Sequence, residues 1–225
     1  MAIVVFQNVS KDYLSEGQRV RALDGISLEV NRGEFVAVMG RSGGGKSTLL
    51  NLAGAMDFPT SGAVLVDGVA TSALKDDGLT RLRREKVGFV FQSFQLLHTL
   101  TVLENVELPL LLAGKTKARS TARECLKWVE LDGLADRRPH QLSGGQMQRV
   151  GIARALVHAP AILLADEPTG NLDTVTGNVI LDLLRRLTRE RNAALLMATH
   201  SAEAAAIADA IVRLRDGKIE GVSRR

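Results

Sequence analysis

Hydrophobic residues in this chain fall into short runs separated by glycine, proline and charged segments. Short apolar runs bounded by such residues are typical of strands, above all where the run carries few polar positions. The run at 34–39 ends directly at Gly40, and the run at 63–66 ends in Asp67-Gly68, a pair that favours a hairpin turn. The pattern predicts strands at 3–5, 27–30, 34–39, 63–66, 87–91, 161–165, 194–199 and 210–214.

Other segments repeat apolar residues every three or four positions, which is the spacing of an amphipathic helix. We expect helices at 46–53, 174–189 and 202–208. Helical patterns also dominate 93–150, where Pro109, Gly114, Gly133 and Pro139 are expected to interrupt them.

Alternating strands and helices around a glycine-rich turn predict an α/β fold with parallel strands. The early strands and the hairpin signal add an antiparallel part, so we expect a mixed sheet. We assign 1–92 and 151–225 to an α/β core and 93–150 to an inserted α-helical subdomain.

Composition is that of an ordinary globular protein, with 45% hydrophobic and 24% charged residues in 225. The net charge is +4, and the basic residues are scattered among acidic ones rather than grouped in blocks. This pattern favours a solvated surface over a nucleic-acid partner. The single cysteine, Cys125, falls at helix spacing with Ala122, Leu126 and Val129, so we expect a buried residue and a reducing compartment.

No apolar run reaches the roughly 18 residues that a membrane-spanning helix needs. The densest patch, at 108–113, is far shorter. The start of the chain lacks a basic region followed by a long apolar stretch, so no secretory signal is expected. Any role at a membrane is therefore expected to depend on a partner.

The segment from Gly40 to Ser47 fits the phosphate-loop pattern G-x-x-x-x-G-K-[ST] at every fixed position. Glycines let main-chain N–H groups surround phosphate oxygens, and the next helix adds its positive end. Lys46 supplies a charge for the terminal phosphates, and Ser47 a hydroxyl for Mg²⁺. The alternative is a merely flexible glycine turn. We predict a P-loop NTPase core that binds ATP and Mg²⁺ with these residues: Gly40, Ser42, Gly43, Gly44, Gly45, Lys46, Ser47 and Thr48.

The apolar run at 161–165 ends in Asp166 and Glu167. Ligands of open α/β sheets gather at the carboxyl ends of strands. Asp166 is therefore a candidate for holding Mg²⁺, and Glu167 for activating the water that attacks the γ-phosphate. A pair of acids that merely caps a loop is the alternative.

At 142–146 the letters LSGGQ resemble the signature motif of ABC-type ATPases. Four further matches occur in family order over about 3–220. Gln92 resembles the glutamine that contacts Mg²⁺ or the water, Asp173 the end of the D-loop, His200 the switch histidine, and Tyr13 the aromatic residue that stacks on adenine. Thr199-His200 also ends a buried strand, where a polar residue needs a reason.

The resemblance implies that Glu167, His200 and Gln92 are catalytic and that two copies of the chain clamp ATP. Ser143, Gly145 and Gln146 begin a helical segment whose N–H groups form a second anion site. In the family that site closes on the nucleotide of the other subunit, so a homodimer on ATP binding is expected.

The subfamily resemblance is to the lipoprotein-releasing, macrolide-exporting and cell-division branch, on the segments 20–25, 103–110 and 166–173. It implies an integral membrane permease subunit as partner, docked beside Gln92 on 93–112, where Phe94 and Leu97 are candidates. It also implies a cytoplasmic location, peripheral on the inner face of the cell membrane. Gly44 departs from the serine of many relatives, with little effect expected because main-chain N–H groups bind there.

Two alternatives stay open. One is a regulatory ABC ATPase that signals to a membrane partner without transport. The other is an ABC ATPase acting on DNA or ribosomes, although the long inserts typical of those proteins are missing here. The base-reading motif of G proteins, N-K-x-D, does not occur. The transported substrate is not encoded in these motifs.

Overall fold

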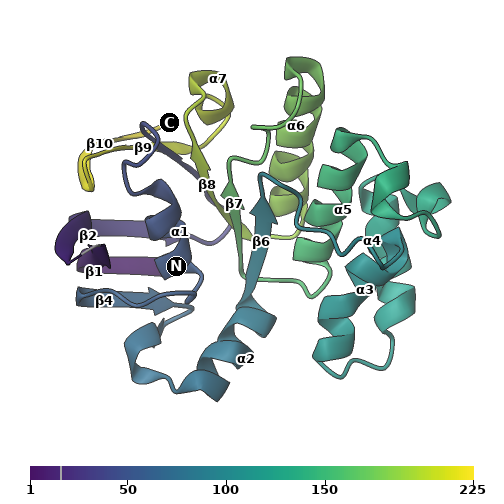
Figure 1. Ribbon diagram of the computed structural model, residues 1–225, viewed down its shortest axis with the longest axis horizontal. Coiled ribbons are helices and arrows are strands. Elements are labelled where there is room, and N and C mark those ends of the chain that lie inside the picture. Colours follow the sequence, from purple (N-terminus) through teal and green to yellow (C-terminus); the bar gives the residue numbers. More distant parts are fainter. Residues whose placement is uncertain (16) are drawn as a thin grey trace.

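A six-stranded sheet forms the centre of the computed structural model, which describes residues 1–15 and 17–225 (Figure 1). Its order is β10-β9-β3-β8-β7-β6, and only β10 runs antiparallel to its neighbour. The strands are β3 (Phe35–Met39), β6 (Val87–Phe91), β7 (Ile162–Asp166), β8 (Ala194–Thr199), β9 (Ala210–Arg215) and β10 (Lys218–Arg224). Because five strands are parallel, their carboxyl ends lie along one edge.

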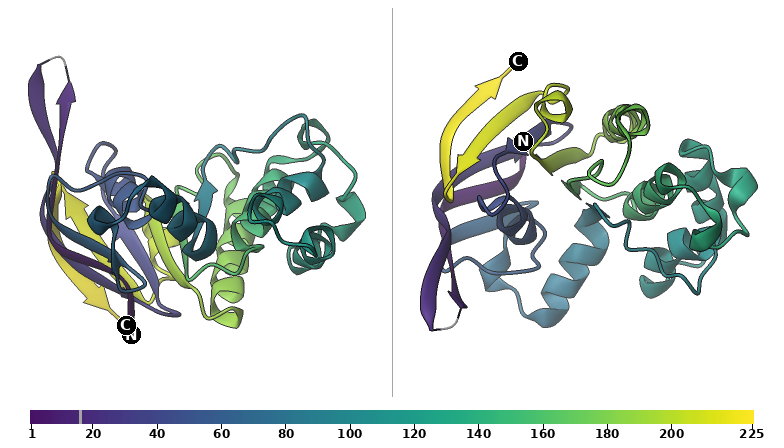
Figure 2. Two further views of the ribbon diagram at one scale, coloured as in Figure 1. Left: turned by 90° about the horizontal axis from the view of Figure 1, so that it is seen from below. Right: turned by 45° about the horizontal axis from the view of Figure 1, so that its top comes forward.

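A second, antiparallel sheet lies beside it, in the order β2-β1-β4-β5. Its strands are β1 (Ala2–Ser15), β2 (Gln18–Asn31), β4 (Ser61–Val66) and β5 (Val69–Ala70). The long β1–β2 hairpin projects from the body of the molecule (Figure 2). Asp67 and Gly68 both have positive φ, which confirms the two-residue turn expected after β4.

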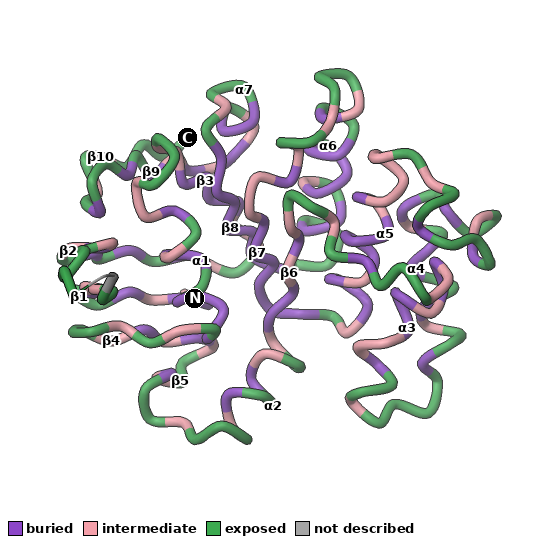
Figure 3. The backbone as a smooth tube through the Cα atoms, in the orientation of Figure 1, coloured by how far each residue is buried: buried purple, intermediate pink, exposed green. Residues whose placement is uncertain are grey.

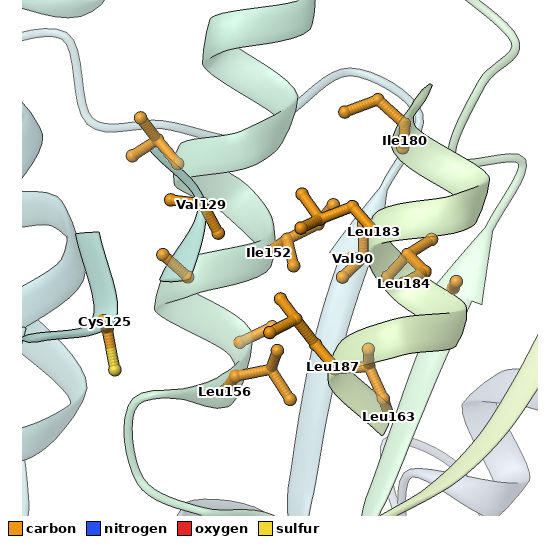
Figure 4. Close-up of a cluster of buried hydrophobic side chains, with 14 of the residues drawn as sticks. Val90, Cys125, Val129, Ile152, Leu156, Leu163, Ile180, Leu183, Leu184 and Leu187 are labelled. Atoms are coloured by element: carbon orange, nitrogen blue, oxygen red, sulfur yellow. The ribbon is translucent and has the colours of Figure 1, made fainter. Parts of the chain in front are cut away.

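Helix α1 (Lys46–Ala53) packs between the two sheets, in a core with residues such as Val36, Val38 and Leu164. Neighbouring strand residues such as Ala37 and Leu163 point to the opposite face of the large sheet, because side chains alternate along a strand. Helices α5 (Gly144–Leu156) and α6 (Thr174–Glu190) cover that face (Figure 4). The large sheet is thus buried on both sides (Figure 3).

Helices α3 (Val102–Leu112) and α4 (Ala118–Trp128) pack with α5 at the end of the molecule away from the antiparallel sheet (Figure 1). Cys125 is buried there, as expected, and burial raises the pKa of its thiol to about 12. The remaining helices are α2 (Asp76–Lys86) and α7 (Ala202–Ala205). Among the described residues, no helix is both long and apolar enough to cross a bilayer.

Several element predictions were wrong in extent. Helix α2 and strand β10 were missed, β1 and β2 are much longer than expected, and α7 ends before 208. Pro109 lies inside α3 rather than interrupting it. Pro109 has no N–H to donate to the main-chain oxygen of Asn105, and the helix ends three residues later at Leu112. The division of the chain at 150 stays a proposal, and that position falls inside α5.

Gly88 lets α5 approach β6 closely, since a Cβ atom there would lie 2.2 Å from the main-chain oxygen of Ala155. We predict that Gly88→Ala lowers the free energy of unfolding by about 1–3 kcal/mol, because strand and helix must separate. Urea unfolding followed by circular dichroism measures it. Gly133→Ala is the control, because a Cβ atom at Gly133 meets nothing within 4 Å. Equal stability of both variants would contradict the close packing.

Candidate functional site

A cavity of about 650 Å³ opens at the carboxyl edge of the large sheet. Loops that follow four adjacent strands, β3, β8, β7 and β6, contribute to it. Its lining brings together most of the predicted site residues: Ser42, Gly43, Gly45, Lys46, Ser47, Thr48, Gln92, Asp166, Glu167 and His200. Ala22 and Arg41 complete the lining.

The phosphate loop leaves the main-chain N–H groups at the start of α1 uncovered. Gly45 precedes the helix with φ 99°, and no side chain caps it. A Cβ atom at Gly45 would lie 2.5 Å from the Ala22 oxygen, and one at Gly40 would lie 2.2 Å from the Leu214 oxygen. Glycine is therefore required both for the turn and for packing against β2 and β9. The open helix end is a site for an anion.

Gly40 and Gly44 line a second cavity of about 490 Å³, which the loop shares with Arg213, Arg215, Asp216 and Glu220. Gly44 does not have positive φ, and a Cβ atom there would lie 3.1 Å from the Arg41 oxygen. This contact is tight but is made with a single main-chain atom. The small effect expected for glycine in place of serine stays a prediction.

Lys46 is folded back into its own loop. Only 6% of the residue is exposed, and Nζ donates to the main-chain oxygens of Gly40 at 2.9 Å and Arg41 at 3.0 Å. The Oε1 atom of Glu167 lies 3.8 Å from the same nitrogen. The ammonium group is thus held at the cavity by neutral acceptors and one carboxylate, where an incoming anion can reach it.

Glu167 lies between Lys46 and His200. Its Oε2 atom is 2.5 Å from His200 Nδ1, and its φ of 47° is left-handed, a conformation that strains a non-glycine residue by about 1–3 kcal/mol. Hydrogen bonds at both ends of the turn stabilise it, because Glu167 N donates to Ala198 O and Gly170 N to Glu167 O. The burial argument for His200 was wrong, since its side chain is 67% exposed. The hydrogen bond to Glu167, rather than burial, marks His200 as a candidate site residue.

Three oxygen-bearing side chains line the cavity in a set that suits Mg²⁺. Asp166 ends β7, Gln92 follows the neighbouring strand β6, and Ser47 lies in the first turn of α1. Mg²⁺ prefers oxygen ligands and takes few of them from protein when phosphates supply the rest. Within 1–15 and 17–225, no cluster of three histidine, cysteine or acidic residues forms an all-protein metal site.

Tyr13 lies outside the cavity lining but next to it. Its hydroxyl donates to Asp57 Oδ2 at 2.8 Å, and Lys11 Nζ lies 4.9 Å from the ring centroid. Burial raises the pKa of Tyr13, and the Asp57 carboxylate raises it further, whereas the neighbouring hydroxyl of Thr48 lowers it. Adenine stacking stays a prediction. The contacts with Asp57 and Lys11 hold the Tyr13 ring in place beside the cavity.

The signature residues are absent from the cavity of their own chain. Ser143 caps α5 in a capping box with Gln146, with main-chain to side-chain distances of 3.3 and 2.9 Å. A Cβ atom at Gly145 would lie 2.5 Å from Thr176 Cγ2, so this helix start packs against α6. Asp173 caps α6, and hydrogen bonds from the hydroxyl and N–H of Thr176 lower the pKa of Asp173. Ser143, Gly145, Gln146 and Asp173 thus do not line this cavity, although Asp173 lines a neighbouring cavity of about 290 Å³ together with Glu167 and His200.

Sequence reasoning missed Arg41 and Asp57, and it placed Asn171 only in the segment 171–173 that resembles the D-loop, without a contact to Gln92. Arg41 is a variable position of the phosphate-loop pattern, and Asp57 is distant in sequence from the tyrosine it holds, so no signal marked them. Asn171 exchanges hydrogen bonds with Gln92: Gln92 Nε2 donates to Asn171 Oδ1 at 3.2 Å, and Asn171 Nδ2 donates to Gln92 O at 3.1 Å. Its place in a loop directly after a candidate catalytic residue was the available hint.

Comparison with known proteins agrees with this geometry. The ABC transporter family model matches residues 23–170. An ABC transporter ATP-binding protein of Methanocaldococcus jannaschii, MJ0796, is 47% identical over 97% of this chain and 95% of the relative. The macrolide export ATP-binding/permease protein MacB of Mannheimia succiniciproducens is 45% identical over 97% of this chain, which spans 34% of that protein.

Solved structures give the same result. A dimeric structure of the MJ0796 cassette matches with a TM-score of 0.90 and 45% identity, over 98% of both chains. A second dimeric structure of that cassette, in a post-hydrolysis state with ADP and Pi, matches equally well. This chain therefore belongs to the ABC transporter family and is an ATP-binding cassette that hydrolyses ATP.

Proposed function

We propose that this cassette powers the export or release of a substrate, of lipoprotein, macrolide or peptide type, through a separate membrane subunit. The observation that carries the hydrolysis step is the position of the Glu167 carboxylate, which lies 2.5 Å from His200 Nδ1 and 3.8 Å from Lys46 Nζ beside an open helix end. The similarity to MacB supports export. MacB is named as both ATP-binding protein and permease, and this chain corresponds to a third of its length. A permease subunit on another chain would supply the membrane-spanning part. The cassette would then lie on the inner face of the membrane.

ATP binds with its terminal phosphates on the phosphate loop. Lys46 gives up the main-chain oxygens of Gly40 and Arg41 for phosphate oxygens, so an ion pair with phosphate replaces contacts with two neutral acceptors. Ser47, Asp166 and Gln92 are the residues that would hold Mg²⁺, which would neutralise charge on the phosphates. Glu167 orients the attacking water and accepts its proton, and His200 fixes the carboxylate that does so.

A second copy of the chain completes the site. Ser143 and Gly145 sit at an N-terminal helix end that does not line the cavity of its own chain. In a head-to-tail pair that end faces the γ-phosphate of the other copy, where its N–H groups stabilise developing negative charge. The dimeric state of the MJ0796 structures supports this arrangement. A single chain is then expected to hydrolyse ATP slowly.

A groove of about 510 Å³ between α2, β6, α3 and α5 is the candidate docking surface for the membrane subunit. Its apolar lining includes Phe89, Phe91, Leu108, Pro109 and Leu112, and its cationic lining comprises Arg83, Arg84 and Arg154. Phe94 and Leu97, the candidates taken from sequence, lie outside it, because Phe94 packs against the core and Leu97 points elsewhere at the surface. Burial lowers the pKa of Arg154 and that of His158, which also lines the groove.

Replacing Lys46 tests the phosphate loop. We predict that Lys46→Ala weakens ATP binding roughly 10- to 100-fold, because a charge-assisted contact worth about 1.5–3 kcal/mol is lost. Titration with a fluorescent ATP analogue measures the dissociation constant. Lys115→Ala, a change in the exposed loop after α3, is the control and should bind normally. Unchanged affinity of the Lys46 variant would remove the phosphate-loop assignment.

Replacing Glu167 separates binding from hydrolysis. Glu167→Gln keeps the shape of the side chain but cannot accept a proton, so we predict retained ATP affinity and a kcat roughly 10²–10⁴-fold lower. Because the closed state cannot turn over, a dimer should accumulate with ATP on size-exclusion chromatography. Glu203→Gln, on the exposed side of α7, is the control. Normal turnover by the Glu167 variant would exclude the proposed role.

Two adjacent leucines of α3 test the groove. Leu112 lines it and is 65% exposed, whereas Leu111 is 54% exposed and does not line it. We predict that Leu112→Glu abolishes co-purification with the membrane subunit from detergent-solubilised membranes and leaves basal ATPase activity unchanged. Leu111→Glu should co-purify normally. Loss in both variants, or in neither, would count against this groove.

A further inference from the structure

Gln148 is a polar residue in a position that otherwise suits an apolar one. It lies in the second turn of α5 and is 0% exposed. Its helix packs against the large sheet and α6 through Ile152 and Leu156 (Figure 4). A buried amide is unfavourable unless it is hydrogen-bonded, so the contacts of this side chain need an account.

The side chain joins α5 to two loops of the site. Gln148 Nε2 donates to the main-chain oxygen of Pro168 at 2.6 Å and to that of Phe91 at 3.3 Å. Phe91 precedes Gln92, and Pro168 follows Glu167. Strands β6 and β7 are neighbours and pair Phe91 with Asp166, so one amide spans both strand ends.

The amide oxygen of Gln148, unlike its nitrogen, makes no hydrogen bond within 1–15 and 17–225. Gln148 Oε1 is buried and has no hydrogen-bond partner among the described residues. An amide turned the other way would set oxygen against two carbonyl oxygens, so the two donor contacts fix its orientation. An apolar side chain would avoid the unpaired oxygen altogether. The two N–H donors are therefore what this position uses.

The loops that Gln148 holds are also tied to each other. Gln92 and Asn171 exchange two hydrogen bonds, and Gly170 N donates to Glu167 O at 3.0 Å. A Cβ atom at Gly170 would lie 2.6 Å from Gln92 Nε2, so the two loops are in close contact. The two carbonyls that Gln148 binds therefore belong to loops that contact each other beside both candidate catalytic side chains.

We infer that Gln148 is a positioning residue that couples the signature helix to Glu167 and Gln92. This rests on the proposed function, in which the start of α5 meets the nucleotide of a second copy. Gln148 follows Ser143 by little more than one turn of a continuous helix. A shift of the helix start therefore moves the Gln148 side chain with it. Engagement of the signature by the second copy then adjusts the position of Glu167 in the first.

The test is a double-mutant cycle on the full chain. Gln148→Met keeps the length of the side chain and removes both donors. We predict a kcat roughly 10- to 100-fold lower, as expected for a misplaced catalytic group, with an ATP dissociation constant within about twofold of the parent. Ile152→Val, a buried change one turn further along α5, controls for lost stability and should keep the parental kcat.

The decisive comparison is made in the Glu167→Gln background, with single-turnover release of labelled phosphate. If Gln148 acts through Glu167, adding Gln148→Met changes this residual rate by less than about twofold. Equal fold-losses in both backgrounds, or a parental kcat for the single variant, would overturn the inference. Should Gln148→Met not fold, Gln148→Asn replaces it, because the shorter amide cannot reach both carbonyls. If Glu167→Gln alone is fully active, the proposed function fails instead.

Discussion

The site depends on one constraint: the main chain from Gly40 to Gly45 lies directly against neighbouring backbone. Leu214 of β9 and Ala22 of β2 occupy the space that side chains at Gly40 and Gly45 would need. This packing fixes the turn that leaves the first N–H groups of α1 uncovered, and it holds Lys46 over the loop. An anion-binding helix end results from the packing of bare backbone, and phosphate chemistry follows from it.

The order of the parallel strands brings the other site residues to the phosphate loop. The phosphate loop, His200, Glu167 and Gln92 follow β3, β8, β7 and β6, which are consecutive in the sheet although far apart in sequence. Each strand therefore delivers one function to the same edge: anion binding, a histidine contact, the carboxylate and the amide. Helix α5, which begins at the signature motif, packs on one face of the large sheet. Its Gln148 side chain contacts the loops that follow β6 and β7. In the proposed dimer, the start of α5 completes the site of the other copy, because it does not line the cavity of its own chain.

Local signals predicted the parts of the structure that local chemistry decides. The phosphate loop, the buried strands and the acidic pair each need particular residues in a fixed order, so the P-loop NTPase core could be recognised. Long-range packing decided the rest. Helix α2 has few buried residues, chiefly Leu79 and Leu82, and its pattern is mostly polar. Strand β10 has no buried residue, because it is an edge strand of the sheet, so it carries no apolar run. The contacts of Asp57 with Tyr13 and of Gln148 with Pro168 join segments that no sequence pattern links.

The most direct measurement of the central claim is a crystal structure of the chain with a non-hydrolysable ATP analogue and Mg²⁺. The account predicts the β- and γ-phosphates on the N–H groups of 43–47, with Lys46 Nζ moved from the oxygens of Gly40 and Arg41 to the phosphates. Glu167 should face a water in line with the γ-phosphate. An analogue bound away from this loop, with Lys46 still on its two main-chain oxygens, would contradict the account.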